Sequence, residues 1–400
     1  MNIVGVYGED YPWDVRVEKL LRGCVDHGHQ VRLVCRNLKR RALVEDADGI
    51  SCHRVLGPGC PAAVHATMTL PAPGNPLWRR AIRRACRDFA PDLLIVRDLP
   101  LALLVIEEAE RLGIPALVDM AENHPAMWQN VVDSDRIRWR SWLLKNPALA
   151  RRLERKVARR AAGVLVVVEE MRDHLVRVGA PPERIHIVSN TPPRAILAHE
   201  ADPALTADGM IDLIYVGNVT RTRGLQQVIS ALADPSLVSS AFRFRVVGAG
   251  DYLPVLKALS RDLGVVDRVV FHGWVDSREV PALVARCHVG VIPHLKTEHT
   301  DTTVPNKLFD FMAAGLPVVV SNALPMQRIV QEQGCGLAFA GDDPASLPRC
   351  LRDLADPSRR TDLGRHGRHA VATLYNWERD LDRALQVVTT LGMTSAPAGA

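Results

Sequence analysis

The 400-residue sequence lacks the features that mark membrane-embedded or exported proteins. It contains no run of about eighteen apolar residues, the length that a membrane-spanning helix requires. The first residues, Met1–Val6, have the pattern of a first β-strand and not of a signal peptide. We therefore expect a cytoplasmic protein, with peripheral attachment to the inner face of the membrane as its closest association with lipid.

Paired thiols and a strong net charge are missing as well. The eight cysteines are scattered singly, which fits reduced structural thiols and not a zinc site or a disulfide framework. The formal net charge is only +5, so nucleic-acid binding is not indicated. The glycine fingerprint of dinucleotide-binding proteins does not follow the first strand, which disfavours a dehydrogenase.

The basic residues are unevenly distributed. Five arginines fall between Arg79 and Arg87, and ten basic residues fall between Arg136 and Arg160. Two interpretations remain open. The arginines can lie on solvated helix faces, with their stems covering apolar surface. Alternatively, they form a patch that faces anionic lipid or a phosphate-bearing acceptor and supports peripheral membrane association.

Short β-branched runs alternate with helical segments along the whole chain. The expected strands are 2–7, 30–35, 93–97, 116–119, 164–168 and 185–188, then 212–216, 242–247, 268–271, 289–293, 317–321 and 336–339. Apolar strands without alternation are buried on both faces, as in parallel sheets flanked by helices. The Pro-rich joint at Asn190–Pro193 separates two such series, which predicts an α/β protein of two Rossmann-like domains facing an inter-domain cleft.

The segment His299–Ser321 carries the most chemical information. It reads as a polar loop, a helix that begins near Pro305, a stop at Gly315 and a short apolar strand. The amides from Thr303 to Lys307 then lie near an open helix N-terminus, which binds phosphate, and the lysine adds a positive charge. Asp310, one turn further, can accept hydrogen bonds from hydroxyls. The segment indicates a site for a nucleoside diphosphate with a sugar attached.

Two glycine turns follow expected strands in the second half. Gly217–Gly224 allows a sharp turn and brings Arg223 to a position where its guanidinium can hold two phosphate oxygens. The same segment is also compatible with an ordinary β-to-α loop. Val246–Asp251, which contains Gly248, is a weaker signal because such turns are common in this fold class.

The segment Asn306–Val319 resembles the donor-site helix of retaining, nucleotide-sugar-dependent glycosyltransferases of the GT-B architecture. More narrowly, it is similar to the bacterial family 4, or group 1, enzymes related to mannosyl- and N-acetylhexosaminyl-transferases. The resemblance extends in family order to segments 215–225, 246–251, 270–274, 14–19 and 28–31. It implies an acceptor-side domain at 1–190, a donor domain at 191–375, a helix at 376–391 crossing back to the first domain and a disordered tail at 392–400.

The resemblance also implies roles for individual residues. Arg223 and Lys307 would hold the diphosphate. Glu122 would form a hydrogen bond to the reacting groups or accept a proton from them, and His124 is the weaker candidate for the same role. His124 also fits an ordinary histidine in a loop. The expected donor-binding residues are Gly217, Asn218, Gly248, His272, Thr302, Thr303, Asn306 and Asp310, and those on the acceptor side are Gly8, Asp14 and Arg16. Either His272 or Trp274 can instead be a packing residue, and Asp14 can instead be a helix N-cap.

Three positions depart from the family pattern. Asn218 stands where a basic residue is usual, Thr302 where a glutamate is usual, and Ala121 where many relatives have a histidine. The changes leave phosphate recognition better supported than recognition of the sugar hydroxyls.

Two acidic or histidine-containing groups imitate metal sites. They are Asp133-Ser-Asp135, in an expected polar loop, and the trio His294, His299 and Asp301. The first group is discounted because it lies in a loop and not at the end of a strand. The trio could be spaced for a metal, but the resemblance implies that side chains and helix dipoles stabilise the leaving diphosphate, so that no metal is required. We expect no metal and no cofactor.

The sequence therefore predicts a retaining glycosyltransferase. It would move a sugar from a nucleotide diphosphate sugar to a hydroxyl of a lipid-linked or glycan acceptor, in cell-surface polysaccharide or glycolipid synthesis, without nucleic acid as a partner. Two alternatives remain: a non-catalytic nucleotide-sugar-binding subunit, and a nucleotide-sugar epimerase of the same architecture.

Overall fold

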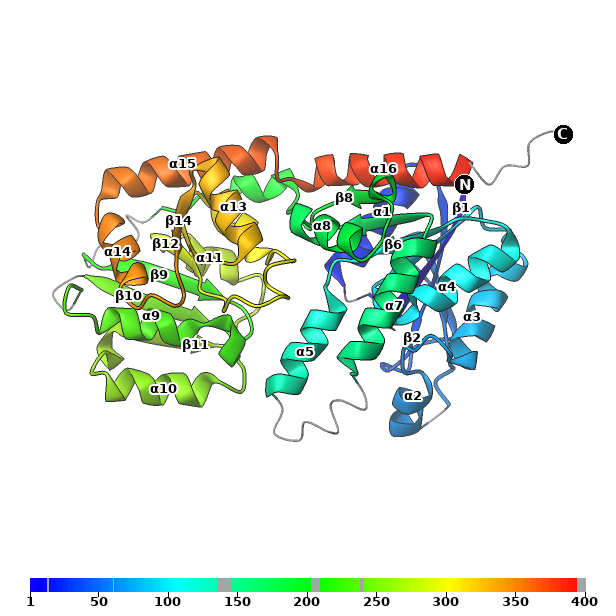
Figure 1. Cartoon of the computed structure of the whole chain (residues 1–400), viewed down its shortest axis with the longest axis horizontal. Coiled ribbons are helices and arrows are strands. Elements are labelled where there is room, and N and C mark those ends of the chain that lie inside the picture. The colour runs from blue at the N-terminus through cyan, green and yellow to red at the C-terminus, as the bar shows by residue number, and fades with distance from the viewer. Residues whose placement is uncertain (13, 60, 135–144, 203–208, 238–240, 394–400) are drawn as a thin grey trace. The chain divides into compact units, whose positions relative to one another are not determined.

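The computed structural model describes residues 1–12, 14–59, 61–134, 145–202, 209–237 and 241–393. The chain forms two compact units, which are described separately: unit 1 contains residues 1–190 and the segment from Asp380 onward, and unit 2 contains residues 191–379 (Figure 1). The last helix continues to Met393, so positions 392 and 393 are helical and not part of a tail. Residues 394–400 of the predicted tail lie outside the described residues.

Unit 1 is built from alternating strands and helices. Its elements are β1 (Asn2–Asp10), α1 (Val15–Asp26), β2 (Gln30–Arg36), β3 (Val44–Ala47), β4 (Ile50–Arg54), α2 (Ala62–Met68), α3 (Pro76–Arg87), β5 (Leu93–Arg97), α4 (Leu99–Leu112), β6 (Ala116–Asp119), α5 (His124–Ser134), α7 (Pro147–Arg160), β7 (Gly163–Val166), α8 (Glu169–Arg177), η1 (Pro182–Arg184) and β8 (Ile185–Ile187).

The sheet of unit 1 has the order β3-β4-β2-β1-β5-β6-β7-β8. All neighbouring pairs are parallel except β3 with β4 at the edge. The chain winds outward in one direction from β1 to β4 and then in the other from β5 to β8. The strand order therefore reverses between β1 and β5, and ligands of such sheets bind at the carboxyl ends of the strands at this point.

The sequence prediction missed β3 and β4. Both are short, and polar residues interrupt the apolar runs on which the prediction relied: Glu45 and Asp46 in β3, and Ser51 and His53 in β4. They add an edge to the sheet without changing the point at which the strand order reverses. β1 is also longer than expected, because its last residue, Asp10, pairs with Arg36 of β2 after a shift of register.

Unit 2 repeats the same plan. Its elements are η2 (Arg194–Ala198), β9 (Ile211–Val216), η4 (Arg221–Arg223), α9 (Leu225–Leu232), β10 (Phe242–Val247), α10 (Leu253–Asp262), η5 (Val266–Arg268), β11 (Val269–Gly273), α11 (Val280–Val284), β12 (Val289–Ile292), α12 (Lys307–Ala313), β13 (Val318–Ser321), α13 (Leu324–Gln333), β14 (Gly336–Phe339), α14 (Ser346–Asp353) and α15 (Pro357–Thr373). The sheet is parallel, with the order β11-β10-β9-β12-β13-β14. This is the strand order of a dinucleotide-binding Rossmann sheet, and it reverses between β9 and β12.

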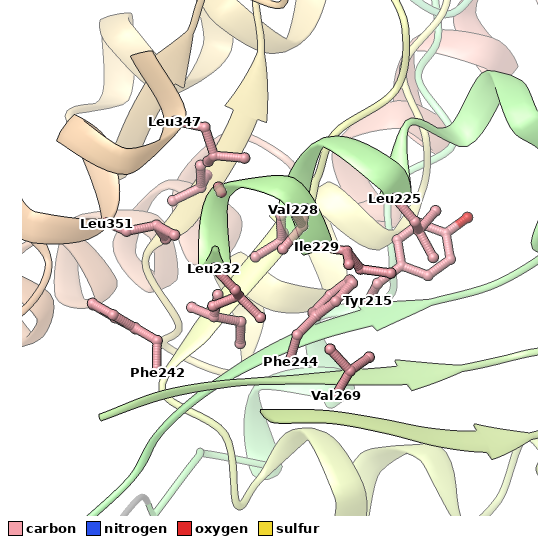
Figure 2. Packing of buried hydrophobic residues seen from close by; sticks show 14 of the residues in the cluster. Tyr215, Leu225, Val228, Ile229, Leu232, Phe242, Phe244, Val269, Leu347 and Leu351 are labelled. Atoms are coloured by element: carbon pink, nitrogen blue, oxygen red, sulfur yellow. The ribbon is translucent and has the colours of Figure 1, made fainter. Parts of the chain in front are cut away.

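An apolar cluster fixes α9 on the sheet of unit 2. Figure 2 shows Ile229 and Leu232 of α9 on the side of the helix that faces the strands carrying Phe244 and Val269. Tyr215 belongs to the same cluster, and its hydroxyl lies at the edge of the drawn group. Burying such side chains contributes roughly 1.5–3 kcal/mol each. The cluster therefore holds the loop between β9 and α9, where the predicted diphosphate residues are found.

Helix α16 (Trp377–Met393) packs on unit 1 with the part that follows Asp380 (Figure 1). Glycines make room for its leucines. A Cβ at Gly23 of α1 would lie 2.3 Å from Leu381, and one at Gly163 of β7 would lie 3.0 Å from Leu391. The end of the chain thus completes the N-terminal unit by close contacts that larger residues would block.

Two arginines of α3, Arg79 and Arg83, lie in an ion-pair network. Arg79 pairs with Glu107 and Glu108 at 2.7 and 2.9 Å, and Arg83 pairs with Glu108 at 2.9 Å. Burial would raise the pKa of Glu108, but hydrogen bonds from Arg83 and Arg111 outweigh it and lower this pKa to about 2. These side chains join α3 to α4, which gives them a structural role. Part of the second basic stretch, residues 136–144, lies outside the described residues.

The structure bears on two further expectations, those for membrane-spanning helices and for paired cysteines. In the part of the chain that the structure describes, no helix is both long enough and apolar enough to cross a membrane. Seven cysteines are free thiols, and the eighth, Cys60, lies outside the described residues.

Candidate active site

Two glycine turns of unit 2 lie in contact at the carboxyl ends of β9 and β10. Gly217 has a φ of 132° and Gly248 a φ of 145°, a region that side chains disfavour. A Cβ at Gly248 would lie 1.9 Å from the carbonyl oxygen of Gly217. The two turns therefore need glycine for both conformation and space.

Lys307, the first residue of α12, reaches into this turn. Its ammonium lies 4.0 Å from the ring centroid of Tyr215, in cation–π geometry. A Cβ at Gly217 would lie 2.7 Å from its Nζ. Burial, together with the charge of Arg223, places the pKa of Lys307 well below its ordinary value, and Asp310 opposes this only in part. An arriving anion would relieve that cost.

Arg223 and His294 form the second half of the site. The Arg223 guanidinium lies 3.3 and 3.4 Å from the two ring nitrogens of His294, which follows β12 and is buried. Burial and the neighbouring charges of Lys307 and Arg223 lower the pKa of His294 well below its usual range. A neutral histidine there is a hydrogen-bonding partner that adds no further positive charge.

The backbone holds Arg223 and His294 together. Gly224, at a φ of 71°, packs so closely that a Cβ would lie 1.7 Å from the carbonyl oxygen of Pro293. The hydroxyl of Ser321 donates to the carbonyl of His294 at 2.5 Å. The loops after β9, β12 and β13 are thereby tied to one another at the point where the strand order reverses.

The sequence argument considered His294 only as a metal ligand and did not assign Tyr215 a role. Both could have been found from the strand pattern, because Tyr215 lies near the end of one apolar run and His294 directly follows another. Their pairing with Lys307 and Arg223 depends on the strand order, which the sequence pattern does not specify.

The start of α12 agrees with the predicted phosphate-binding segment. The amides of Leu308 and Phe309 donate to the carbonyls of Pro305 and Asn306, so the first turn is closed. The amides that precede Leu308 have no acceptor within the helix. Asp310 is exposed on the same turn. Two cations and a helix start therefore meet at one place, an arrangement suited to a polyvalent anion.

The other predicted donor residues differ in what they contact. Thr302 is buried, and its hydroxyl donates to the carbonyls of Glu298 at 2.8 Å and His299 at 3.1 Å. Thr303 is partly buried, and Asn306 is exposed immediately before α12. Thr302 thus shapes the loop that precedes Lys307.

Asn218 and the segment after β11 form the rest of the predicted donor side. The side chain of Asn218 is exposed, and its carbonyl accepts a hydrogen bond from the Tyr215 hydroxyl at 2.7 Å. His272 is half-buried, and burial lowers its pKa. Trp274 is 75% exposed, which excludes the packing interpretation for this residue.

In unit 1, the residues predicted for the acceptor side take up mainly structural positions. Asp14 caps α1, accepting from the amides of Arg16 at 2.8 Å and Val17 at 3.0 Å, which confirms the N-cap interpretation. Arg16 is buried and donates to both carboxylate oxygens of Asp119, the shortest contact being 2.6 Å. Gly8 lies in β1 and packs against Pro71. A Cβ added at Gly8 would lie 3.1 Å from the ring of this proline.

Asp98, which follows β5, was not among the residues predicted from the sequence. Its φ of 66° is rare for a residue with a side chain, and such outliers cluster at functional sites. Its amide donates to the carbonyl of Asp119 at 2.9 Å. Burial raises the pKa of Asp98, whereas Arg16 and Arg97 overcome burial and lower that of Asp119. Two nearby carboxyls whose pKa values shift in opposite directions can hold different protonation states at the same pH.

Glu122 and His124 lie at the same edge of the sheet. His124 is buried and begins α5, so the interpretation as an ordinary loop histidine is wrong. Its Nδ1 donates to the carbonyl of Glu122 at 3.2 Å, which leaves Nε2 as an acceptor in the neutral ring. The ring meets Trp128 edge-on, with 6.1 Å between centroids. The Glu122 side chain is partly exposed.

The two groups that resemble metal sites in the sequence are Asp133-Ser-Asp135 and the trio His294, His299 and Asp301. Within the described ranges, no three His, Cys, Asp or Glu side chains converge as metal ligands would. Asp301 accepts a hydrogen bond from the amide of Leu324 and lies 3.5 Å from Lys296. Asp133 lies on α5, and Asp135 is outside the described residues. The expectation of a metal-free, cofactor-free site remains a prediction.

Comparisons with known proteins agree with this arrangement. Residues 14–191 match the family described as "Glycosyl transferase 4-like domain", and residues 211–356 match "Glycosyl transferases group 1". The 2-deoxystreptamine glucosyltransferase of Streptomyces kanamyceticus is 29% identical over 70% of this chain and 74% of its own length. A GDP-mannose-dependent phosphatidylinositol monomannoside mannosyltransferase of Mycobacterium tuberculosis is 27% identical over 42% of this chain and 44% of its own.

Solved structures share the fold. HepE of Anabaena, in complex with UDP-glucose, superposes with a TM-score of 0.70 at 12% identity, covering 98% of this chain and 100% of that one. The two family matches together span most of the chain, and each falls mainly on one of the two Rossmann-like units. The chain is therefore a GT-B glycosyltransferase of the group 1, or type 4, family.

Proposed function

We propose that this glycosyltransferase takes a hexosyl group from a nucleoside diphosphate sugar and transfers it, with retention, to an acceptor hydroxyl. The observation that carries the proposal is the pairing of Lys307 and Arg223 beside His294, at the reversal of strand order in unit 2. Two basic side chains that meet at one place match the extra negative charge that a diphosphate gains as it leaves.

The proposed reaction needs no metal. The bond between the sugar C1 and the β-phosphate oxygen breaks, with its electron pair passing to the phosphate. The acceptor oxygen bonds to C1 on the same face, and its proton goes to an oxygen of the departing β-phosphate. Arg223 and Lys307 would stabilise that phosphate, and the amides before Leu308 would add fixed dipoles. This route suits a chain with Ala121 in place of the usual histidine.

The base and the sugar remain to be identified. The names of similar proteins support a nucleotide sugar, but they point to different ones: UDP-glucose for HepE and GDP-mannose for the mycobacterial enzyme. A role in glycolipid synthesis is supported by the name of the mycobacterial enzyme, whose acceptor is a phosphatidylinositol monomannoside.

The first test is a thermal-shift panel of UDP, GDP, ADP, dTDP and CMP against the wild type and Lys307→Ala. We expect one diphosphate to stabilise the wild type and to have little effect on the variant. That result would locate the donor site and name the base. The absence of a shift with every nucleotide would contradict a donor site that forms without acceptor.

A second test separates transfer from its alternatives. With the matching sugar nucleotide and a panel of acceptors, proton NMR of the product would give the anomeric configuration. Product of the donor's configuration supports retention, and inversion would refute it. Donor binding without sugar release would favour a non-catalytic subunit, and an epimerised nucleotide sugar formed without acceptor would favour an epimerase.

A further inference from the structure

Unit 1 contains an apolar groove of about 630 Å³ that the proposed chemistry does not use. Prolines and large apolar side chains line it from four segments: Pro71, Pro73, Pro100, Leu103, Trp128 and Leu149. Leu149, in the first turn of α7, is 62% exposed. An exposed apolar surface of this kind marks a binding site more often than chance exposure.

The groove adjoins the polar edge of the sheet at three points. Pro71 packs against Gly8 of β1, and Pro100 comes two residues after Asp98. Trp128 meets the ring of His124. An apolar group in the groove would therefore extend from the place where the acceptor hydroxyl is expected.

One rim of the groove is strongly basic. Arg152, Arg155, Lys156 and Arg159 line it from α7, and all four are exposed. The helix α7 contains six basic residues and one acidic residue, Glu154. That carboxylate is buried and contacts His174 at 3.0 Å, so it does not offset the charge of the rim.

The contrast with the other arginine-rich helix is informative. On α3, Arg79 and Arg83 pair with Glu107 and Glu108 of α4. On α7, Arg160 pairs with Glu110 at 2.6 Å, whereas the four rim residues border the groove. The charge of the second basic stretch therefore lies beside apolar surface, where an anionic amphiphile would meet it.

We propose that the groove holds the apolar segment of an anionic lipid and that the α7 rim binds its phosphate, so that this lipid is the acceptor. The inference rests on the proposed function and specifies its acceptor class. Positive charge beside the groove favours a negatively charged amphiphile and disfavours a cationic acceptor such as an aminocyclitol. The apolar walls favour a lipid over a free sugar phosphate.

The test uses dihexanoylphosphatidic acid, kept as a monomer below its critical micelle concentration, with the full-length protein and no nucleotide. Calorimetry should show saturable binding to the wild type. Leu149→Glu and Arg155→Glu should each weaken it by at least about tenfold, through lost apolar contact and reversed charge. Both residues are exposed, so the fold should be retained.

Matched controls are available on α8 of the same unit. Val176→Glu and Arg177→Glu make the same chemical changes at exposed positions outside the groove and should leave binding unchanged. Neutral dihexanoylphosphatidylcholine and glycerol 3-phosphate should bind much more weakly than the anionic lipid. Equal binding of either probe would overturn the proposal, because it would remove the need for the charge or for the apolar segment.

Two further results would also overturn it: binding that Leu149→Glu and Arg155→Glu do not change, and binding to anionic phosphatidylglycerol vesicles without binding of the monomer. The latter would make this face a membrane-docking surface. The nucleotide thermal-shift panel is read independently of the groove variants. A failed lipid site with intact donor binding is thus distinguishable from failure of the transferase proposal.

Discussion

The ammonium of Lys307 occupies the space that a side chain at Gly217 would need, since an added Cβ would lie 2.7 Å from Nζ. The glycine at the end of β9 therefore allows a cation from a distant segment to lie over the ring of Tyr215. The amino group of Lys307 is in position before any ligand arrives. A binding site whose groups are positioned in advance has little to rearrange when the diphosphate leaves.

Diphosphate binding should take up a proton at Lys307. Burial lowers the pKa of this lysine in the free protein, and a bound diphosphate would raise it again. As pH rises through the lowered pKa, the free protein loses the proton that the complex needs, so affinity should fall with rising pH. Calorimetry in two buffers of different ionisation enthalpy measures the uptake.

Lys307→Met is the control for this linkage. It should abolish most of the proton uptake and weaken binding by about 10- to 100-fold, the effect of losing a charged hydrogen bond. Uptake that persists unchanged in Lys307→Met would show that another group, such as His294, accepts the proton.

Arg223→Ala should lower turnover by about 10²–10³-fold while leaving the fold intact, because it removes a charge needed mainly as the leaving group departs. Steady-state kinetics with saturating donor would measure this, and circular dichroism would confirm folding. Arg221→Ala is the matched control in the same short helix, where Arg221 is exposed. Equal losses in both variants would show that the loop's total charge matters and not the position of Arg223.

The fold could be predicted well from the sequence, because apolar strands and glycine turns report backbone geometry directly. All twelve expected strands occur, four of them with the expected bounds and the others with ends shifted by at most three residues. The strands β3 and β4, at and next to the edge of the sheet, escaped prediction because polar residues interrupt their apolar runs. The motif around Lys307 was also recognisable, since a helix start, a stop and a lysine are local features.

The partners of these residues were less predictable. Arg16 reads as a functional arginine in sequence, but it is buried against Asp119, which lies 103 positions away. Asp98 gave no motif, and its positive φ is visible only in the folded backbone. Such long-range pairings depend on the order of strands in the sheet, which a single sequence does not encode in its periodicity.

Close backbone contact should make Gly224 far less replaceable than its backbone angle alone suggests. Gly224 and Gly264 have nearly the same φ, 71° and 67°, but a Cβ at Gly264 would meet nothing within 4 Å. Gly264→Ala should therefore cost only the left-handed strain, roughly 1–2 kcal/mol. Gly224→Ala should cost more, because the Pro293 carbonyl must also move.

Urea unfolding of both variants, followed by tryptophan fluorescence, would measure the difference. The affinity for the donor nucleotide is a second measurement. It should fall in Gly224→Ala, because displacement of Pro293 would also displace His294. Equal destabilisation of the two variants would mean that the loop after β12 yields easily and does not hold the site in place.

The neighbouring carboxyls Asp98 and Asp119 should respond in opposite ways to the same substitution. Burial raises the pKa of Asp98 despite Arg97, 3.3 Å away, so the folded state binds more protons there than the unfolded state. Its contribution to stability falls as pH rises from the ordinary value through the raised pKa. Asp98→Asn removes this cost at neutral pH and keeps a side chain that tolerates positive φ, so stability should rise or remain unchanged.

Asp119→Asn should instead lose about 3–5 kcal/mol, because it leaves the buried guanidinium of Arg16 without its counter-charge. The pKa of Asp119 is lowered, so its contribution is present above the ordinary value and is lost as pH falls through the folded pKa. Urea titrations of both variants between pH 4 and pH 8 would compare the slopes. Since Asp98 then costs stability at neutral pH, a loss of transferase activity in the stabilised Asp98→Asn would indicate that the strained, buried carboxyl is retained for the acceptor reaction.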